Sequence, residues 1–279
     1  MAKRALLIGI NRYQIPGSDL RGCVNDVQDL QAALIEVCSF KKADITVMTD
    51  ADASTKAMQA SIKALVKASK KGDVALLHYS GHGSNVPDDN GDESDGRDEI
   101  LCPTDLDWDN PLRDDWLRTT FDGLREGVAM TVIMDCCHSG TNTRAIQPPD
   151  APIKERYLPS PVALWAAETG RGLRRPVTSE LRRSSRAARN KSDVVNADLP
   201  EVLITGCRDT QTSADAFINN RYNGALTFAL VEAIRASKGR LSYLDLHDRA
   251  SRTLKQRKFD QVPQLEGRRA RFDTPLFGA

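Results

Sequence analysis

The sequence lacks a long hydrophobic run, an excess of charge of one sign and a dense set of cysteines. No stretch of about 18 consecutive apolar residues occurs, which excludes a membrane-spanning helix and gives no reason to expect a membrane partner. The formal net charge of the 279 residues is +1, which argues against nucleic acid as the main partner. Six cysteines are too few for a disulfide scaffold in a chain of this length, so a reducing, cytoplasmic location is the simpler expectation.

The amino-terminal segment MAKRALLIGI also lacks the features of a signal peptide. Asn11 and Arg12 interrupt its apolar run, and no cleavage site of small residues follows. We therefore expect neither a targeting segment nor a recruitment prodomain before Lys3.

Apolar residues recur in short runs of strand length and in longer stretches with helical spacing. The short runs predict strands at residues 3–10, 45–48, 74–79, 130–134 and 202–205. The longer stretches predict helices at residues 20–40, 55–70, 114–126, 225–237 and 243–255. Because strands and helices alternate, the pattern favours right-handed crossovers and a mostly parallel sheet, which is an α/β fold.

Two of these strands end in residues that can carry nucleophilic chemistry. The strand at 74–79 runs into a turn in which glycines flank His82, and the strand at 130–134 runs into Asp135, Cys136 and Cys137. The carboxyl ends of strands in an open α/β sheet face the crevice where ligands bind. A histidine in a tight turn and a buried cysteine are the structural alternatives, but their joint occurrence favours a catalytic thiol and imidazole.

Four motifs follow one another along the chain: LRGCVNDV, HYSGHG, DCCHSG and GCRDTQTSADA. Together they resemble the metacaspases, relatives of the caspases among the Cys-His peptidases, and the similarity extends over nearly the whole chain except residues 141–199. The resemblance implies a three-layer αβα caspase-like sandwich with a mostly parallel central sheet, in a monomer. It also implies that Cys137 is the nucleophile, that His82 is the general base and that Cys136 is only a neighbour.

The chemistry of these groups agrees with the implied roles. A free thiol with a pKa of about 8.5 is mostly protonated at neutral pH, and a nearby imidazole favours the thiolate. The backbone N–H groups of Gly83 and Cys137 are candidates for an oxyanion hole from their positions alone. No acid or amide in the sequence is marked as a third catalytic member, so we predict a dyad.

The resemblance also implies a pocket for the side chain that precedes the scissile bond, lined by Cys23, Asp26, Ser80 and Asp135. Two carboxylates at the base of a pocket favour a guanidinium or ammonium group and repel aspartate, so we predict protein or peptide substrates cleaved after Arg or Lys. For Asp26 alone, stabilisation of a helix N-terminus is the alternative role.

The acidic segment 88–99 carries seven acids against one arginine. By resemblance, Asp98, Asp114 and Asp115 match positions that bind calcium in many metacaspases, and carboxylate oxygens are the ligands that this ion prefers. The segment does not fit an EF-hand, and a solvated acidic loop is the alternative. We expect Ca²⁺ as an activator and no organic cofactor.

Residues 141–199 differ in composition from the rest, with ten basic and three acidic residues between Lys154 and Lys191. We predict a larger catalytic part at 1–140, a flexible basic linker at 141–199 and a smaller part of the same domain at 200–279. If the enzyme cleaves after Arg or Lys, it can process its own linker; an unprocessed insertion is the alternative. The candidate positions for self-cleavage are Arg174, Arg175, Arg182, Arg183, Arg186 and Arg189.

Three other interpretations compete with the peptidase. A cysteine phosphatase needs five residues between its Cys and Arg, whereas six separate Cys137 from Arg144. A zinc site built from Cys136, Cys137 and His138 is unfavourable, because adjacent side chains cannot easily turn onto one ion. A catalytically silent, calcium-responsive scaffold of the same fold is the remaining alternative to the peptidase.

Overall fold

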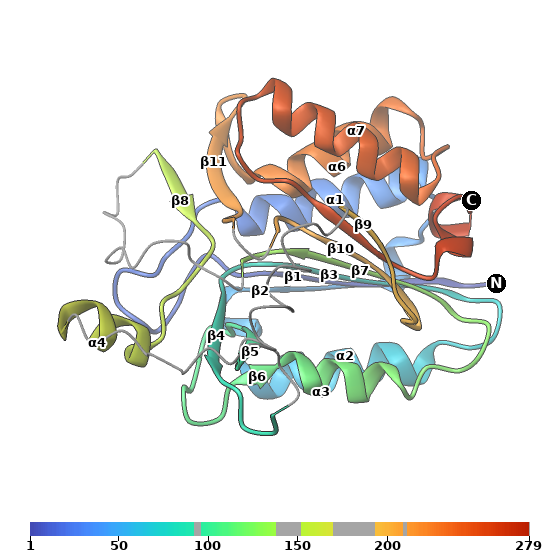
Figure 1. The fold of residues 1–279 in the computed structure, drawn as a ribbon. Helices are drawn as coiled ribbons and strands as arrows, with labels where there is room; N and C mark the ends of the chain where they lie inside the picture. The colour runs from blue at the N-terminus through green and yellow to red at the C-terminus, as the bar shows by residue number, and fades with distance from the viewer. Residues whose placement is uncertain (92–95, 138–151, 170–192, 209–210, 279) are drawn as a thin grey trace, which may run out of the picture.

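The computed structural model describes residues 1–91, 96–137, 152–169, 193–208 and 211–278. Its centre is a seven-stranded sheet with the strand order β2-β1-β3-β7-β10-β13-β9 (Figure 1). Neighbouring strands are parallel except for the antiparallel pair β10 and β13. In chain order the strands are β1 (Lys3–Gly9), β2 (Ile45–Thr49), β3 (Val74–Ser80), β7 (Ala129–Asp135), β9 (Val194–Asn196), β10 (Glu201–Thr205) and β13 (Gln264–Gly267).

Helices cover both faces of this sheet. One face carries α1 (Cys23–Val37), α6 (Ala225–Ala236) and α7 (Tyr243–Gln256), and the other carries α2 (Thr55–Ala68) and α3 (Asp114–Phe121) (Figure 1). Alternate side chains of a strand enter opposite layers, so Leu7 packs in the core on one side while Leu6 and Ile8 pack in the core on the other. The predicted three-layer α/β arrangement with a mostly parallel sheet is confirmed.

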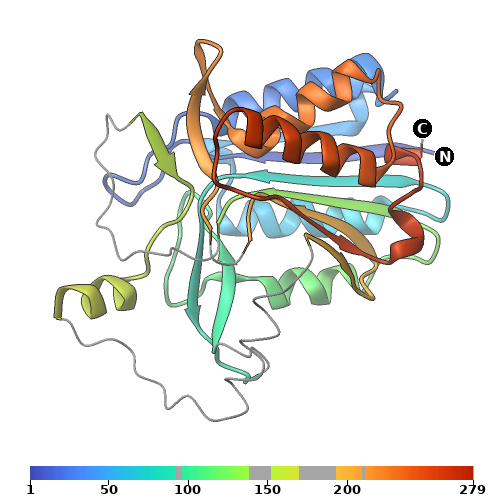
Figure 2. The ribbon, with the colours of Figure 1, turned by 45° about the horizontal axis from the view of Figure 1, so that its top comes forward.

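Two small antiparallel sheets extend the carboxyl ends of the central strands. One consists of β4 (Gly83–Pro87), β5 (Arg97–Leu101) and β6 (Leu112–Arg113), and the other of β12 (Arg221–Gly224), β11 (Ala214–Ile218) and β8 (Ile153–Glu155). Figure 2 shows β4 and β5 as a pair projecting from the central sheet. The acidic segment 88–99 begins directly after β4, and its last three residues belong to β5. Residues 92–95 lie outside the described ranges.

The remaining elements are short. Helix α4 (Pro161–Thr169) follows β8, and single turns of 3-10 helix occur at Lys42–Asp44, Asp50–Asp52, Arg269–Arg271 and Leu276–Gly278. Within the expected linker 141–199, the described residues therefore include β8, α4 and β9, while the division into three parts stays a prediction. In the described part of the chain, no helix combines the length and the apolar character needed to cross a bilayer.

Candidate active site

The two strands that the sequence analysis singled out are neighbours in the sheet. Strand β3 pairs with β7 in parallel, and Ser80 lies opposite Asp135 at their carboxyl ends. His82 and Cys137 each come two residues beyond this pair, so both leave the sheet at the same edge. Both are buried, His82 with 5% and Cys137 with 0% of its surface exposed. Parallel pairing in register therefore brings the predicted dyad to one place.

Ser18 and Tyr13 hold His82 in place. Its Nε2–H donates to the carbonyl oxygen of Ser18 at 2.7 Å, and its backbone N–H donates to the hydroxyl of Tyr13, whose ring lies 4.9 Å from the imidazole. Nδ1 is buried and has no hydrogen-bond partner among the described residues. This arrangement fixes the tautomer in which Nδ1 is the free base, and burial lowers the pKa of His82 to about 4.

Ser18 was not among the sequence predictions. Its backbone carbonyl orients the histidine in the way that an acid or amide side chain would in a triad. Every residue has a backbone carbonyl, so residue type does not reveal which one orients the histidine. The sequence therefore indicates only a dyad.

The two backbone N–H groups predicted as an oxyanion hole point at the same atom. Gly83 N–H donates to the carbonyl oxygen of Arg156 at 3.0 Å, and Cys137 N–H donates to the same oxygen at 3.1 Å. The Cys137 thiol is engaged by the backbone of Ser213, from which it accepts an N–H bond and to whose carbonyl it donates at 3.6 Å. The two N–H groups thus form a preorganised site for one carbonyl oxygen beside the thiol.

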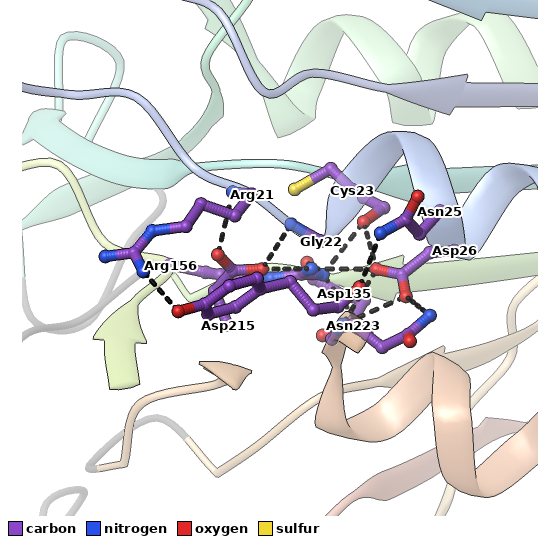
Figure 3. A network of polar contacts seen from close by, with 12 residues as sticks. Arg21, Gly22, Cys23, Asn25, Asp26, Asp135, Arg156, Asp215 and Asn223 are labelled. Atoms are coloured by element: carbon purple, nitrogen blue, oxygen red, sulfur yellow. Dashed lines mark hydrogen bonds and ion pairs between the residues drawn. The ribbon is translucent and has the colours of Figure 1, made fainter. Parts of the chain in front are cut away.

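A buried arginine fills the predicted specificity pocket. Figure 3 shows the guanidinium of Arg156 among carboxylates from three separate parts of the chain. Its Nη2 lies 2.7 Å from Asp26 Oδ2 and 3.1 Å from Asp215 Oδ1, and its Nη1 lies 3.2 Å from Asp135 Oδ2. Nη1 also donates to Ser80 Oγ at 2.8 Å. The four charged side chains are at most 1% exposed, so the ion pairs are shielded from water.

Backbone N–H groups hold the three pocket carboxylates in place. Asp135 accepts from the N–H of Thr227 at 2.8 Å in the first turn of α6, and Asp26 accepts from Gly224 N–H at 2.9 Å. Asp215 accepts from Gly22 N–H, also at 2.9 Å, just before α1. Each carboxylate is therefore positioned by donors near a helix N-terminus. Burial still raises the pKa of Asp26 to about 7, against the opposing effect of Arg156.

The four predicted pocket residues lie together, but the role of Cys23 differs from that of the other three. Asp26, Ser80 and Asp135 contact the guanidinium directly. Cys23 is buried at the start of α1, where desolvation raises the pKa of its thiol well above the usual value. Because it stays neutral, Cys23 contributes a pocket wall and no charge.

Asp215 and Arg156 were missed by the sequence analysis. Asp215 lies within the quoted motif GCRDTQTSADA, and its carboxylate could have been proposed as a third pocket acid. Arg156 is one of ten basic residues between Lys154 and Lys191, and nothing in its local sequence distinguishes it from the others.

The predicted calcium ligands are placed on β5 and α3. Asp98 is 1% exposed and forms an ion pair with Arg113, while its Oδ1 has no hydrogen-bond partner among the described residues. Asp114 and Asp115 begin α3, and Asp115 accepts from the side chain of Asn90 at 2.8 Å. In the described residues, no three His, Cys, Asp or Glu side chains group closely enough to hold a metal ion. Asp98 Oδ1 is therefore an atom that a cation could contact while Arg113 keeps its ion pair with Oδ2.

Other predictions fall on neighbouring or undescribed residues. Cys136 is 2% exposed and packs in the core on the α2 side of the sheet, away from the Cys137 site. His138 lies outside the described residues, as do the six self-cleavage candidates Arg174, Arg175, Arg182, Arg183, Arg186 and Arg189.

Because two histidines are buried, we predict that the free energy of unfolding decreases in mild acid. Burial lowers the pKa of both His78 and His82 from 6.5 to about 4. The unfolded chain therefore takes up these protons near pH 6.5 and the folded chain only near pH 4, so the stabilisation is complete above pH 6.5 and is lost as the pH falls toward 4. Each histidine accounts for about 2 kcal/mol of lost unfolding free energy between pH 7 and pH 5.

Urea denaturation at pH 7 and pH 5 measures this effect. In His78→Gln the decrease between the two pH values should be about 2 kcal/mol smaller than in the wild type. An equal decrease in both proteins would show that His78 does not titrate as its burial requires.

The chain is similar to proteins of one family. A family profile described as "Metacaspase, peptidase C14 domain" matches residues 3–145. The chain is 32% identical to Metacaspase-1A of Neurospora crassa, over 94% of this chain and 62% of that protein. It is 34% identical to Metacaspase-1B of Neosartorya fischeri, over 94% of this chain and 68% of that protein. Over 146 residues it is 44% identical to Metacaspase-7 of Arabidopsis thaliana, covering 50% of this chain and 35% of that protein.

Solved structures show the same fold. A Geobacter sulfurreducens protein aligns with a TM-score of 0.70 and 28% identity, covering 99% of this chain and 98% of its own. Caspase-1 from Spodoptera frugiperda aligns with a TM-score of 0.56 and 13% identity, covering 95% and 90%. This second likeness confirms the predicted caspase-like fold. With the profile match and the identity over most of its length, the chain belongs to the metacaspase family of cysteine peptidases.

Proposed function

We propose that the protein is an endopeptidase that cleaves after arginine, and less efficiently after lysine. The observation that carries this proposal is the buried guanidinium of Arg156 on the carboxylates of Asp26, Asp135 and Asp215. The backbone N–H of Cys137 donates to the carbonyl oxygen of the same arginine. A basic side chain and its carbonyl are thus recognised together, next to the thiol.

The catalytic groups follow from their contacts. Nδ1 of His82 is the free nitrogen, so it would accept the proton of the Cys137 thiol and later return it to the leaving amine. Ser18 keeps the imidazole in the required tautomer. The N–H groups of Gly83 and Cys137 would stabilise the negative charge that develops on the substrate carbonyl oxygen.

The pocket favours arginine over lysine because it uses two nitrogens at once. Nη1 contacts Asp135 and Nη2 contacts both Asp26 and Asp215. A lysine ammonium presents a single nitrogen and cannot occupy both positions. Aspartate would bring a fourth carboxylate into a buried site and should be rejected.

Replacing Asp215 by asparagine tests the missed pocket acid. The substitution removes one charge-assisted contact with the guanidinium, worth about 1.5–3 kcal/mol, so kcat/KM for an Arg-terminated fluorogenic peptide should fall roughly 10- to 100-fold. Asp198→Asn is the matched control, because Asp198 is 89% exposed and pairs with Arg268 at the surface. Comparable rates for Asp215→Asn and the wild type would exclude Asp215 from the pocket.

We propose calcium as an activator, bound near Asp98 and the start of α3. The buried Asp98 Oδ1 without a partner supports this role, because a hard cation could satisfy it. The ion would supply positive charge there in addition to that of Arg113, which pairs with Oδ2. Peptide hydrolysis should rise when calcium is added to chelator-treated protein, and Asp98→Asn should lose this response. A rate that is unchanged by calcium and by a chelator would refute the proposal.

We also propose that the chain works as a monomer in a reducing compartment such as the cytoplasm. All six cysteines are free thiols, which supports a reducing environment. Analytical ultracentrifugation of the purified protein would show whether it is a monomer.

A further inference from the structure

His78 is a buried histidine that the catalytic groups described above do not use. It lies on β3 and is 0% exposed. Because side chains alternate along a strand, His78 shares a face with Val74 and Leu76, which pack in the core on the side of α6. Asp135 on β7 shares a face with Ile133, which packs in the same core. The imidazole and this pocket carboxylate therefore lie on the side of the sheet that α6 covers.

Thr227 in the first turn of α6 joins these two groups. Its Oγ1 lies 2.7 Å from Asp135 Oδ2 and 3.1 Å from His78 Nε2. A threonine hydroxyl has a single proton, and a carboxylate oxygen only accepts, so this proton is donated to Asp135. The hydroxyl then accepts from His78, whose ring carries its hydrogen on Nε2. The three side chains form one directed chain of hydrogen bonds that ends on the pocket carboxylate.

The contacts of Asp135 show what this chain controls. Its Oδ2 accepts from the backbone N–H and the hydroxyl of Thr227, at 2.8 and 2.7 Å, and lies 3.2 Å from Nη1 of Arg156. Its Oδ1 accepts from the hydroxyl of Ser213 at 2.7 Å. Thr227 therefore fixes the carboxylate oxygen that pairs with the guanidinium, and Ser213 fixes the other oxygen.

This oxygen pairs with the nitrogen that distinguishes arginine from lysine. Nη2 of Arg156 pairs with Asp26 and Asp215, at 2.7 and 3.1 Å, whereas Nη1 pairs with Asp135. A lysine ammonium in the Nη2 position leaves the Nη1 position unfilled. The alignment of Asp135 Oδ2 therefore contributes to the binding of a guanidinium and not to that of an ammonium group.

We propose that Thr227, held by His78, is a specificity-determining residue that sets the preference of the pocket for arginine over lysine. This inference rests on the function proposed above. Both residues act through Asp135, so they are positioning residues. Without the hydrogen bond from His78, the hydroxyl would be free to turn toward a backbone carbonyl of the preceding turn, which is the common alternative for threonine in a helix. His78 thus keeps the hydroxyl on the carboxylate.

Thr227→Val tests the proposal, because valine keeps the branched shape and lacks the hydroxyl. Two fluorogenic peptides that differ only in their last residue, arginine or lysine, would be compared in the presence of calcium. The ratio of kcat/KM for arginine to kcat/KM for lysine should fall roughly tenfold, since only the arginine peptide depends on the aligned Oδ2. The change should appear as a higher KM for the arginine peptide, with kcat within about twofold of the wild type.

The ratio separates a positioning role from a structural one. Both peptides are hydrolysed by the same preparation, so a smaller folded fraction lowers both rates equally and leaves the ratio unchanged. Thr227→Ser restores the hydroxyl and should return the ratio to within about twofold of the wild type. If the valine variant does not fold, Thr227→Ala removes the same hydroxyl and should lower the ratio in the same way.

Thr253→Val is the matched control. Thr253 lies on α7, and its hydroxyl contacts Glu232 at 3.4 Å and no pocket residue among those described. This variant should keep the ratio of the wild type.

His78→Leu tests the first link of the chain. The ratio should fall by roughly threefold in this variant, and it should fall no further when His78→Leu is added to Thr227→Val. Such non-additivity is expected of residues that act through one network. Additive effects would show that His78 acts independently of Thr227 and would overturn the proposed link.

The outcomes distinguish this inference from the proposed function. If the wild type hydrolyses the arginine peptide and Thr227→Val keeps the same ratio, the inference about Thr227 is overturned and the proposed function stands. If the wild type hydrolyses neither peptide, the proposed function itself fails.

Discussion

Replacing Cys137 with alanine is expected to reduce the hydrolysis of an Arg-terminated peptide by roughly four orders of magnitude or more. In the proposed mechanism the sulfur of Cys137 bonds to the substrate carbonyl carbon, and no neighbouring group can replace it. The oxyanion hole would remain, because the Cys137 N–H belongs to the backbone and stays in alanine. The measurement is kcat/KM with a fluorogenic peptide, after thermal unfolding has shown that the variant is folded.

Cys136→Ala is the matched control for this substitution. Cys136 packs in the core on the opposite side of the sheet, so the variant should lose some stability and keep its activity within a few-fold. Substantial activity of Cys137→Ala, or a loss of activity in Cys136→Ala alone, would show that Cys137 is not the nucleophile.

Gly224→Ala should abolish the recognition of arginine with little change in the backbone. A Cβ atom at residue 224 would overlap the guanidinium of Arg156 and the carboxylate of Asp135. Its φ of −69° is open to any residue, so the clash lies with the pocket contents and not with the chain conformation. We expect kcat/KM for an Arg-terminated peptide to fall roughly a thousandfold, because the overlap excludes the side chain that the pocket is built to bind.

Gly123→Ala is the control for the glycine substitution, because its added Cβ would meet only Thr120 O, at 3.2 Å, and the side chain of Val66. Alkylation of Cys137 by a small, uncharged reagent should proceed in both variants, which would show that the thiol is intact. Normal cleavage after arginine by Gly224→Ala would place the specificity pocket elsewhere.

The layout of the site could be predicted because its two reactive residues follow recognisable strands. Strands β3 and β7 are mostly apolar and almost wholly buried, and the polar residues of the site follow where each apolar run ends. Parallel pairing then brings His82 and Cys137 to one edge without any knowledge of side-chain contacts.

The pocket arginine could not be predicted because its role depends on distant residues. Arg156 meets Asp26 from α1, Asp135 from β7 and Asp215 from β11, and no local pattern links these positions. Arg156 lies in a basic segment whose composition alone predicts a linker. Only the folded chain shows that one of its ten basic residues is buried against three acids.

The short strands at one edge of the central sheet could not be predicted from the sequence either. Strand β13 is only four residues long and pairs with β10 in antiparallel direction, and β9 has three residues. Strands this short carry too few alternating residues to be distinguished from loops. Their pairing is set by the tertiary structure, with Val194 opposite Leu265.

Covalent labelling of the wild-type protein tests the central claim most directly. Two peptidyl acyloxymethyl ketones that differ only in their last residue, arginine or aspartate, would be compared by mass spectrometry of the labelled peptide. The account predicts that the arginine reagent modifies Cys137 and that the aspartate reagent leaves it unmodified. Equal labelling by both reagents, a preference for aspartate, or modification of a residue other than Cys137 would contradict it.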